Sequence, residues 1–313
     1  MSRFSDKTIG VICGVAAYLC WGFVALYFAV LTDRGVPPMV LLAHRVVWSL
    51  LFCLALVLIL TGGRELVRVF RQPRKLAALA TSSLLIAINW LAFIYAVDTH
   101  QLTEAAMGYF IVPLVSVVLG LVVLRERLNA IQWVSVCIAT FGVSWIVVAG
   151  GKVPWIGLAV AFSFGFYGLV RKLTPVGPIV GLTVETAILT PVAAVYLGVA
   201  TDVATFSGST YLLLALAGAI TAGLLMLYGR AAQALQLSTL GFLQYIAPTC
   251  QLFVALLVRP EAPHWWALAG FVPIWVALLI FSTESGLRSR RERRSGIIPT
   301  LRADSSTVRA CDS

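Results

Sequence analysis

The sequence has 313 residues, of which 60% are hydrophobic and only 12% are charged, whereas a soluble domain has about 45 to 50% apolar and about 25% charged residues. This composition excludes an ordinary soluble globular protein and indicates an integral membrane protein. The formal net charge of +10 would also suit a nucleic-acid-binding protein, but the basic residues lie between apolar segments, so we expect no nucleic-acid partner.

Ten apolar segments are long enough to cross a hydrocarbon core, which takes about 17 to 25 helical residues. The first is too long for the apolar core of a signal peptide, so we interpret it as a retained span. The sequence therefore predicts an all-α integral membrane protein of ten transmembrane helices, with a disordered basic tail over residues 285–313. The predicted spans are residues 8–31, 39–60, 76–97, 104–124, 131–149, 153–171, 179–200, 210–229, 238–258 and 264–282.

The distribution of Lys and Arg predicts the orientation of these spans. If the N-terminus is cytoplasmic, the inner segments hold 19 of these residues, Arg171 and Lys172 among them. The outer loops then hold three, at positions 34, 152 and 259. Because short cytoplasmic loops are enriched in Lys and Arg, both termini are expected in the cytoplasm.

The chain contains an internal repeat. Residues 103–126 superpose on residues 238–261 without a gap, at an offset of 135. Gly14 and Gly22 match Gly157 and Gly165, and residues 38–45 match residues 178–185. Each half has five predicted spans, and since five is odd, the second half enters the membrane from the opposite side. We therefore expect two inverted five-helix repeats, over residues 1–150 and 151–284.

Four motifs carry a resemblance to a known family. They are AHRVVWS, NWLAFIYAVDTHQLTEAAMGYFIVPLVSVVLG followed by RERL, VETAILTP and LSTLGFLQYIAP. Over about residues 8–282 the sequence resembles the RarD-type proteins of the EamA branch of the drug/metabolite transporter superfamily. The resemblance implies a bacterial inner-membrane carrier of two inverted five-helix repeats, with both termini inside. It does not imply a particular substrate.

Two ionisable residues, Arg45 and Glu185, lie inside predicted spans at matching positions of the two halves. An intramembrane charge is costly, so it marks a pathway or a pair. Arg45 lies near the outer end of its helix and Glu185 near the inner end of its own, so we do not expect a direct bridge between them. We expect local partners instead: Glu104 or Asp98 for Arg45, and Arg230 or backbone groups for Glu185.

Arg45, Glu185, Glu104 and Arg230 are therefore candidates for coupling or gating. Arg45 could capture an anionic or polar solute near the outer mouth. Glu185 could bind a cation or carry a proton, since burial favours protonation of a carboxylate near physiological pH. The alternative is that these charges only fix helix packing or anchor helix ends.

Pro113 and Pro248 lie in matching spans and are preceded by Gly108 and Gly241. A proline inside a helix frees a carbonyl group and kinks the helix, and interrupted helices in both halves of a carrier indicate a midplane binding site. The alternative is an ordinary packing kink. The predicted site, which would suit a moderately hydrophobic or aromatic solute, consists of Asn89, Trp90, Tyr95, Tyr109, Phe110, Pro113, Gln244, Tyr245 and Pro248.

These features favour a secondary transporter of small organic molecules that works by alternating access and is a candidate for proton coupling. The alternative is a non-transporting membrane receptor or assembly scaffold, which has no need of a polar centre. The sequence has no catalytic, phosphate-binding or metal-binding motif, so we expect neither enzymatic activity nor a cofactor. The substrate, the direction of transport and the oligomeric state are left open.

Overall fold

A computed structural model describes residues 6–99, 101–151, 153–199, 206–258 and 265–294, and the secondary structure of these ranges is helical. The helices are α1 (Asp6–Asp33), α2 (Pro38–Thr61), α3 (Arg64–Phe70), α4 (Pro73–Asp98), α5 (Leu102–Val122), α6 (Ala130–Ala149), α7 (Trp155–Leu173), α8 (Pro178–Val199), α9 (Gly208–Ala234), α10 (Leu237–Gln244), α11 (Ile246–Val258) and α12 (Trp265–Arg294).

Eight of the described helices are long and apolar enough to cross a membrane: α1, α2, α4, α5, α6, α7, α8 and α9. They correspond to the first eight predicted spans. The ninth predicted span is not one helix, because it divides into α10 and α11 at Tyr245. The tenth corresponds to α12, whose apolar stretch Ala269–Ser285 is shorter. Helix α3 lies in the basic loop after α2 and was not predicted.

The ends of several helices follow from local sequence. Helix α2 begins at Pro38, where the missing N–H of proline costs no helical hydrogen bond. It ends before Gly62, which takes a φ of 58° and donates its N–H to the carbonyl of Leu58. Helix α6 begins with a capping box, in which Asn129 and Gln132 each accept a hydrogen bond from the other's backbone N–H.

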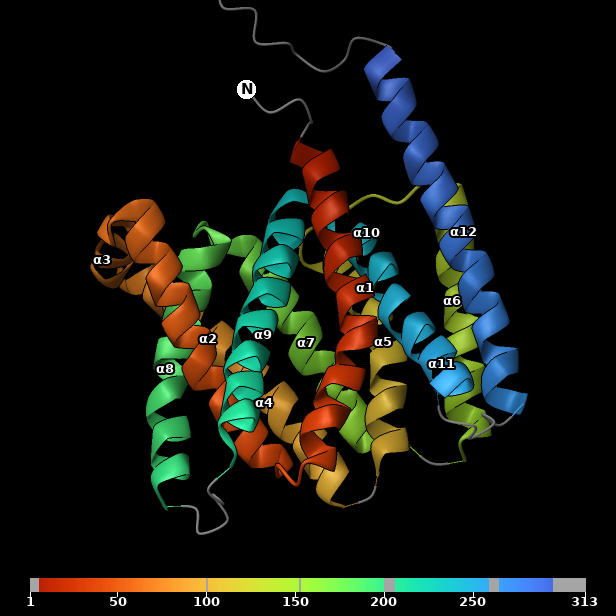
Figure 1. The fold of residues 1–313 in the computed structure, drawn as a ribbon. Helices are drawn as coiled ribbons and strands as arrows, with labels where there is room; N and C mark the ends of the chain where they lie inside the picture. Colours follow the sequence, from red (N-terminus) through yellow and green to blue (C-terminus); the bar gives the residue numbers. More distant parts are fainter. Residues whose placement is uncertain (1–5, 100, 152, 200–205, 259–264, 295–313) are drawn as a thin grey trace, which may run out of the picture.

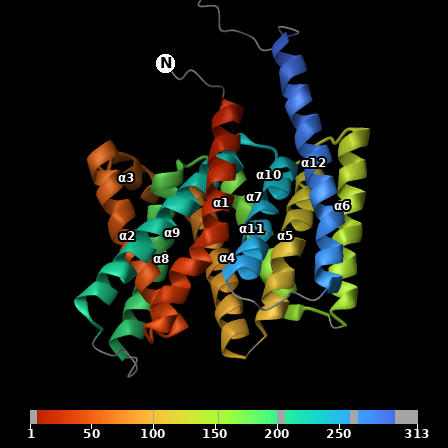
Figure 2. The same ribbon diagram turned by 45° about the vertical axis from the view of Figure 1, so that its right-hand side comes forward.

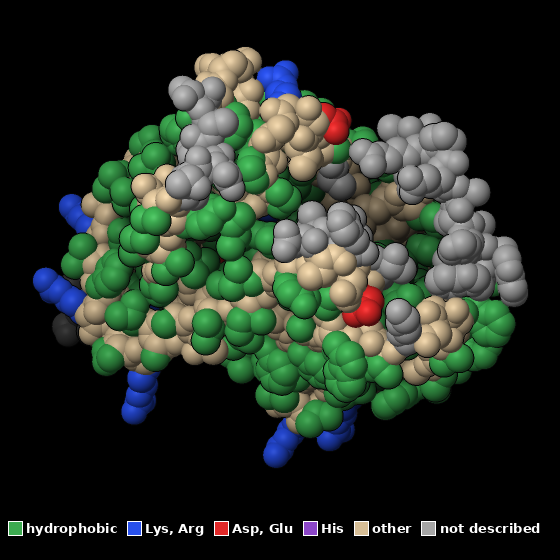
Figure 3. All heavy atoms as spheres, turned by 90° about the horizontal axis from the view of Figure 1, so that it is seen from below, with side chains coloured by type: hydrophobic (Ala, Val, Ile, Leu, Met, Phe, Trp, Pro, Cys, Tyr) green, Lys and Arg blue, Asp and Glu red, His purple; other side chains and the backbone are tan. Residues whose placement is uncertain are grey.

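The start of α1 and the end of α12 lie at the same end of the bundle, which we call the terminal face (Figure 1). Helix α1 packs along α9, α7 packs along both α4 and α5, and α2 packs along α8. Helices α6 and α12 form a pair at one edge of the bundle (Figure 2). Seen from the face opposite to the terminal face, hydrophobic side chains cover most of the described surface, and basic side chains project mainly at its outline (Figure 3).

Glycines allow the closest helix contacts. A Cβ atom built at Gly108 would lie 2.5 Å from the carbonyl oxygen of Gly157, so α5 and α7 meet backbone to backbone. A Cβ atom built at Gly241 would lie 2.7 Å from the carbonyl oxygen of Pro113, so α10 touches α5 directly at its proline. Helix α5 continues through Pro113 without a break, and the real interruption lies in the second half, at Tyr245 before Pro248.

Candidate functional site

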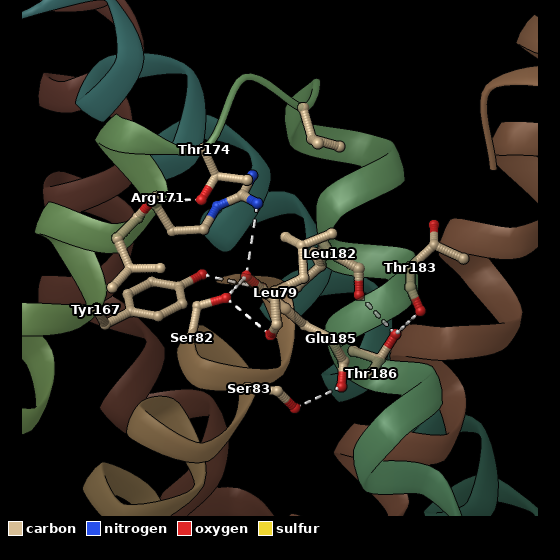
Figure 4. Close-up of polar contacts among 12 residues, drawn as sticks. Leu79, Ser82, Ser83, Tyr167, Arg171, Thr174, Leu182, Thr183, Glu185 and Thr186 are labelled. Atoms are coloured by element: carbon tan, nitrogen blue, oxygen red, sulfur yellow. Dashed lines mark hydrogen bonds and ion pairs between the residues drawn. The ribbon is translucent and has the colours of Figure 1, made fainter. Parts of the chain in front are cut away.

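The carboxylate of Glu185 is the centre of a buried polar cluster (Figure 4). Oε1 of Glu185 lies 3.5 Å from Nη1 of Arg171, and both side chains are 2% exposed. Ser82 donates a hydrogen bond of 2.5 Å to Oε1, and Tyr167 donates one of 3.3 Å to Oε2. The cluster thus joins α4, α7 and α8 around one buried ion pair.

Three contacts from α4 and α7 favour the ionised form of the Glu185 carboxylate. Two hydroxyl donors and one guanidinium direct hydrogens or positive charge at its oxygens, as a buried carboxylate requires. Ser83 in addition donates to the backbone carbonyl of Glu185, at 2.9 Å. A buried pair of this kind stabilises little by itself, but removing one partner typically costs about 3 to 5 kcal/mol.

Arg45 has a different environment. Its Nε donates a hydrogen bond of 3.0 Å to Thr221 on α9. Its guanidinium lies 4.5 Å from the centre of the Phe28 ring and 5.5 Å from that of Trp90, which are favourable cation–π distances. Rings and a hydroxyl, rather than a carboxylate, therefore stabilise this cation.

The described side chains do not show the expected pairs of Glu185 with Arg230 and of Arg45 with Glu104. Glu185 pairs with Arg171, whereas Arg230 pairs with Asp6 at 2.7 Å near the start of α1. Within the described side chains no ion pair joins Arg45 to Glu104, and the side chain of Asp98 lies outside them. The backbone carbonyl of Glu104 instead lies at the contact with Gly157. Among the described side chains, Arg45 and Glu185 have different partners, and their separation stays a prediction.

Sequence reasoning counted Arg171 among the basic residues of the cytoplasmic side, at the end of the predicted span 153–171, and did not identify it as the partner of Glu185. Arg171 lies in the last turn of α7 and is 1% exposed. The internal repeat contained a signal for a buried position at Arg171. Arg171 follows Gly157 and Gly165 by the same numbers of residues as Phe28 follows Gly14 and Gly22. Ser82 and Tyr167, which bond to Glu185, were missed because single hydroxyl residues in apolar helices are usually packing residues.

An aromatic cluster adjoins the ion pair, and sequence reasoning missed it. Tyr228 stacks on Tyr167 with ring centres 5.7 Å apart, and Phe164 and Trp21 lie 5.1 Å and 6.0 Å from Tyr228. Tyr18 meets Tyr228 edge to face at 6.2 Å. We call these five residues, from α1, α7 and α9, the aromatic chamber.

The aromatic chamber contains polar atoms that the described part of the protein leaves without a hydrogen-bond partner. They include the hydroxyl groups of Tyr18 and Tyr228, both of which are buried. The amide nitrogen of Gln244 also has no hydrogen-bond partner among the described residues, while its oxygen accepts a hydrogen bond from Ser116 at 3.3 Å. Nη1 of Arg171 makes the ion pair but no hydrogen bond in the described structure. Buried polar groups normally have partners, so such a group of donors marks a place suited to a polar ligand.

The structure distributes the nine predicted substrate-binding residues over several places. Asn89 is buried and ties α4 to α7, donating to the carbonyl of Val160 at 3.0 Å. Trp90 lies beside Arg45, and Tyr95 is 58% exposed. Their role in binding stays a prediction. Of the others, Tyr109 lies near Phe93, Phe110 packs on Phe271, Pro113 touches Gly241, and Gln244, Tyr245 and Pro248 surround the break between α10 and α11.

The described residues enclose a cleft of about 820 Å³ at the terminal face. Its lining residues come chiefly from α1, α10 and α12, and none of the nine predicted substrate-binding residues lines it. Its walls are mostly apolar, with Lys172, Gln236 and Thr239 among the polar lining residues. The cleft is large enough for a small organic molecule.

Comparisons with known proteins agree on one family. The model of the EamA-like transporter family matches residues 8–148. Protein RarD of Salmonella typhimurium is 42% identical over 288 residues, which cover 90% of this chain and 97% of that protein. A Bacillus subtilis protein named uncharacterized transporter YojE is 40% identical over 300 residues, which cover 94% of this chain and 99% of that protein.

A solved crystal structure also has a similar fold. It is 22% identical to this chain with a TM-score of 0.65, over 89% of this chain and 98% of the other. At this identity the likeness concerns the fold alone.

Proposed function

Because this chain belongs to the EamA-like transporter family as a RarD-type protein, we propose that it is a secondary transporter of small organic solutes. It works by alternating access in the bacterial inner membrane, with the terminal face in the cytoplasm. The observation that carries this proposal is the buried Arg171–Glu185 pair, bonded to α4 inside apolar helices. Such a pair is an expensive feature for a protein that only anchors or assembles.

Two inverted five-helix repeats provide the moving parts. The packing of glycines supports this arrangement: a Cβ atom at Gly22 would lie 2.3 Å from Cβ of Cys250, and one at Gly165 would lie 2.5 Å from Cγ1 of Val115. The internal repeat matches Gly22 with Gly165 and Val115 with Cys250. In the same way, Arg45 bonds to Thr221 of the other half, and Glu185 bonds to Ser82 of the other half.

The solute binds at the aromatic chamber and the adjoining break between α10 and α11. Five rings offer apolar faces, and the hydroxyls of Tyr18 and Tyr228 with the Gln244 amide offer hydrogen bonds. This combination suits a moderately hydrophobic or aromatic solute that carries a hydrogen-bond acceptor. In this conformation the rings pack on one another, so solute binding requires α1, α7 and α9 to separate.

Glu185 is the proton carrier in this proposal. Protonation would cancel its charge and leave Arg171 buried without a counterion, which is unfavourable. Arg171 must then move toward water or toward an anionic group of the solute. Proton binding is thereby linked to a displacement of α7 against α4 and α8.

Reconstitution in liposomes tests the proposal. A panel of hydrophobic and aromatic metabolites is screened for solute-driven proton movement, with wild-type protein, Glu185→Gln and the exposed-site control Glu65→Gln. We expect solute-driven proton movement with the wild type and with Glu65→Gln, and no solute-driven proton movement with Glu185→Gln. Flux in Glu185→Gln with unchanged proton movement would remove the proton role, and no flux over a broad panel would favour a receptor or scaffold.

A further inference from the structure

One carboxylate outside the buried cluster makes an unusually complete set of contacts. Glu126, in the loop between α5 and α6, accepts hydrogen bonds from the backbone N–H groups of Leu237 and Ser238, at 2.6 Å and 3.0 Å. It also accepts one from the Ser238 hydroxyl, at 2.7 Å. These N–H groups form the first turn of α10, where helical donors have no partner within the helix and the helix dipole favours a negative charge. Glu126 therefore caps a helix that lies more than a hundred residues away in the chain.

The backbone before Glu126 is held in a costly conformation. Arg125 has a φ of 53°, and it is the one described non-glycine residue with a positive φ. A side chain in this region is unfavourable, and such strain persists where surrounding contacts enforce it. The N–H of Glu126 bonds back to the carbonyl of Gly120 at 2.9 Å. This turn therefore directs the carboxylate of Glu126 toward α10. The hydrogen bonds of the cap must offset the conformational cost at Arg125.

Lys172 also contacts the junction between α9 and α10, which we call the corner. Its ammonium group donates to the backbone carbonyls of Leu235 and Ala232, at the end of α9. Two opposite charges thus stabilise the corner between α9 and α10. The Glu126 carboxylate accepts hydrogen bonds from N–H groups, and the Lys172 ammonium donates to carbonyl groups.

Helix α10 lies between the cleft and α5. Leu235, Gln236 and Thr239 line the cleft at the terminal face. On the inner side, Gly241 lies against Pro113 and Ser116 of α5, so α10 covers α5 there. At its far end α10 stops at Gln244, whose amide nitrogen has no partner in the described structure. A short helix held by charge at one end and broken at the other is suited to move as a unit.

We propose that Glu126 is the positioning residue of a latch that closes the terminal face, with α10 as the moving part. When Glu126 releases the first turn of α10, the cleft connects with the aromatic chamber and the break beside Gln244. The inference rests on the proposed transport function, because it assigns the closure of the same solute site. Glu126 contacts no solute and acts through α10.

Thiol labelling tests the latch without knowledge of the solute. Ser116→Cys, placed in a chain whose native cysteines are replaced, puts a thiol under α10, since Ser116 is 1% exposed. A membrane-impermeant maleimide is added to inside-out and to right-side-out vesicles. Glu126→Gln is expected to raise labelling from the terminal face on the order of tenfold, because a charge-assisted cap is lost. Ser238→Ala, which removes one of the three contacts, should give a smaller rise, and Glu65→Gln none.

The outcomes separate the latch from the transport function. A higher ratio of terminal-face to opposite-face labelling at an unchanged unfolding temperature supports the latch, since a merely structural role would not alter the ratio. If Glu126→Gln does not fold, the direction of the Ser238→Ala change decides. Unchanged labelling in folded variants overturns the latch, even where solute flux is measured. Altered labelling with no flux over the solute panel supports the latch and counts against transport.

Discussion

The guanidinium of Arg45 lies 4.5 Å from the centre of the Phe28 ring. The internal repeat matches these two residues with the two members of the ion pair in the second half, Glu185 and Arg171. Arg45 matches Glu185 at an offset of 140, and Phe28 matches Arg171 at an offset of 143. One half therefore stabilises a lone cation with aromatic rings, while the other neutralises an anion with a cation. The two positions that the internal repeat matches therefore differ in charge.

The Arg45 site predicts that lysine is a poor replacement. Arg45→Lys loses the planar group that lies over Phe28 and donates to Thr221, and we expect a loss of about 1 to 2 kcal/mol in unfolding free energy. Phe28→Leu should cost a similar amount. The double variant should lose less than the sum, because the two changes remove one shared contact. Unfolding in detergent measures all three, and strict additivity would contradict the contact.

The Arg171–Glu185 pair predicts an asymmetric response to substitution. Arg171→Met leaves Glu185 buried without its cation, and we expect it to lower the unfolding free energy by about 3 to 5 kcal/mol. Combining it with Glu185→Leu should restore much of that loss, because no uncompensated charge then remains. Thermal unfolding of the two variants in the same detergent compares them. A double variant no more stable than Arg171→Met would show that the pair is not the source of the loss.

The sequence predicted the large features of the fold, because apolar length alone identifies a helix that can cross a membrane. The eight long helices follow directly from that signal. It could not predict the division of α10 from α11, since Pro113 and Pro248 occupy matching positions, yet only the second-half helix is interrupted. Packing against neighbouring helices decides whether a proline interrupts its helix.

The site was harder to predict than the fold. Glu185 was identified because a carboxylate inside an apolar segment is rare, but its partner Arg171, at the end of the predicted span 153–171, was counted only as a basic residue of the cytoplasmic side. An arginine in the last turn of a helix can reach outward to lipid headgroups or inward to a buried anion, and the sequence does not distinguish these. Glu126 was identified only as the end of a repeat, because its cap on α10 depends on the path of a distant segment.

Close glycine contacts predict where small residues are required. Gly165→Ala would place a Cβ atom 2.5 Å from Cγ1 of Val115, and we expect a marked loss of stability, since overpacking typically costs about 1 to 3 kcal/mol. Val115→Ala should relieve much of it. Gly223 of α9 is the control, because a Cβ atom there would meet nothing within 4 Å, and alanine is the better helix former. Equal losses at Gly165 and Gly223 would contradict the packing.

The internal repeat makes a last prediction about the latch. Glu126 matches Glu261, and Ser238 matches Thr103, at the same offset of 135. Glu261 lies outside the described residues, so this prediction rests on the sequence repeat and on the contacts of Glu126 alone. If the halves act as inverted equivalents, the two glutamates favour opposite states of the transporter.

Glu261→Gln should therefore change the labelling of Ser116→Cys in the direction opposite to Glu126→Gln, lowering it from the terminal face. The labelling of the double variant should be close to that of the wild type. The two changes would weaken both closed states and leave the balance between them nearly unchanged. Labelling of all three variants in inside-out vesicles, with Glu65→Gln as the control, makes the comparison. A rise with Glu261→Gln as large as that with Glu126→Gln would show general loosening of the bundle rather than two opposed closures. That result would remove the inverted relationship while leaving the cap on α10 in place.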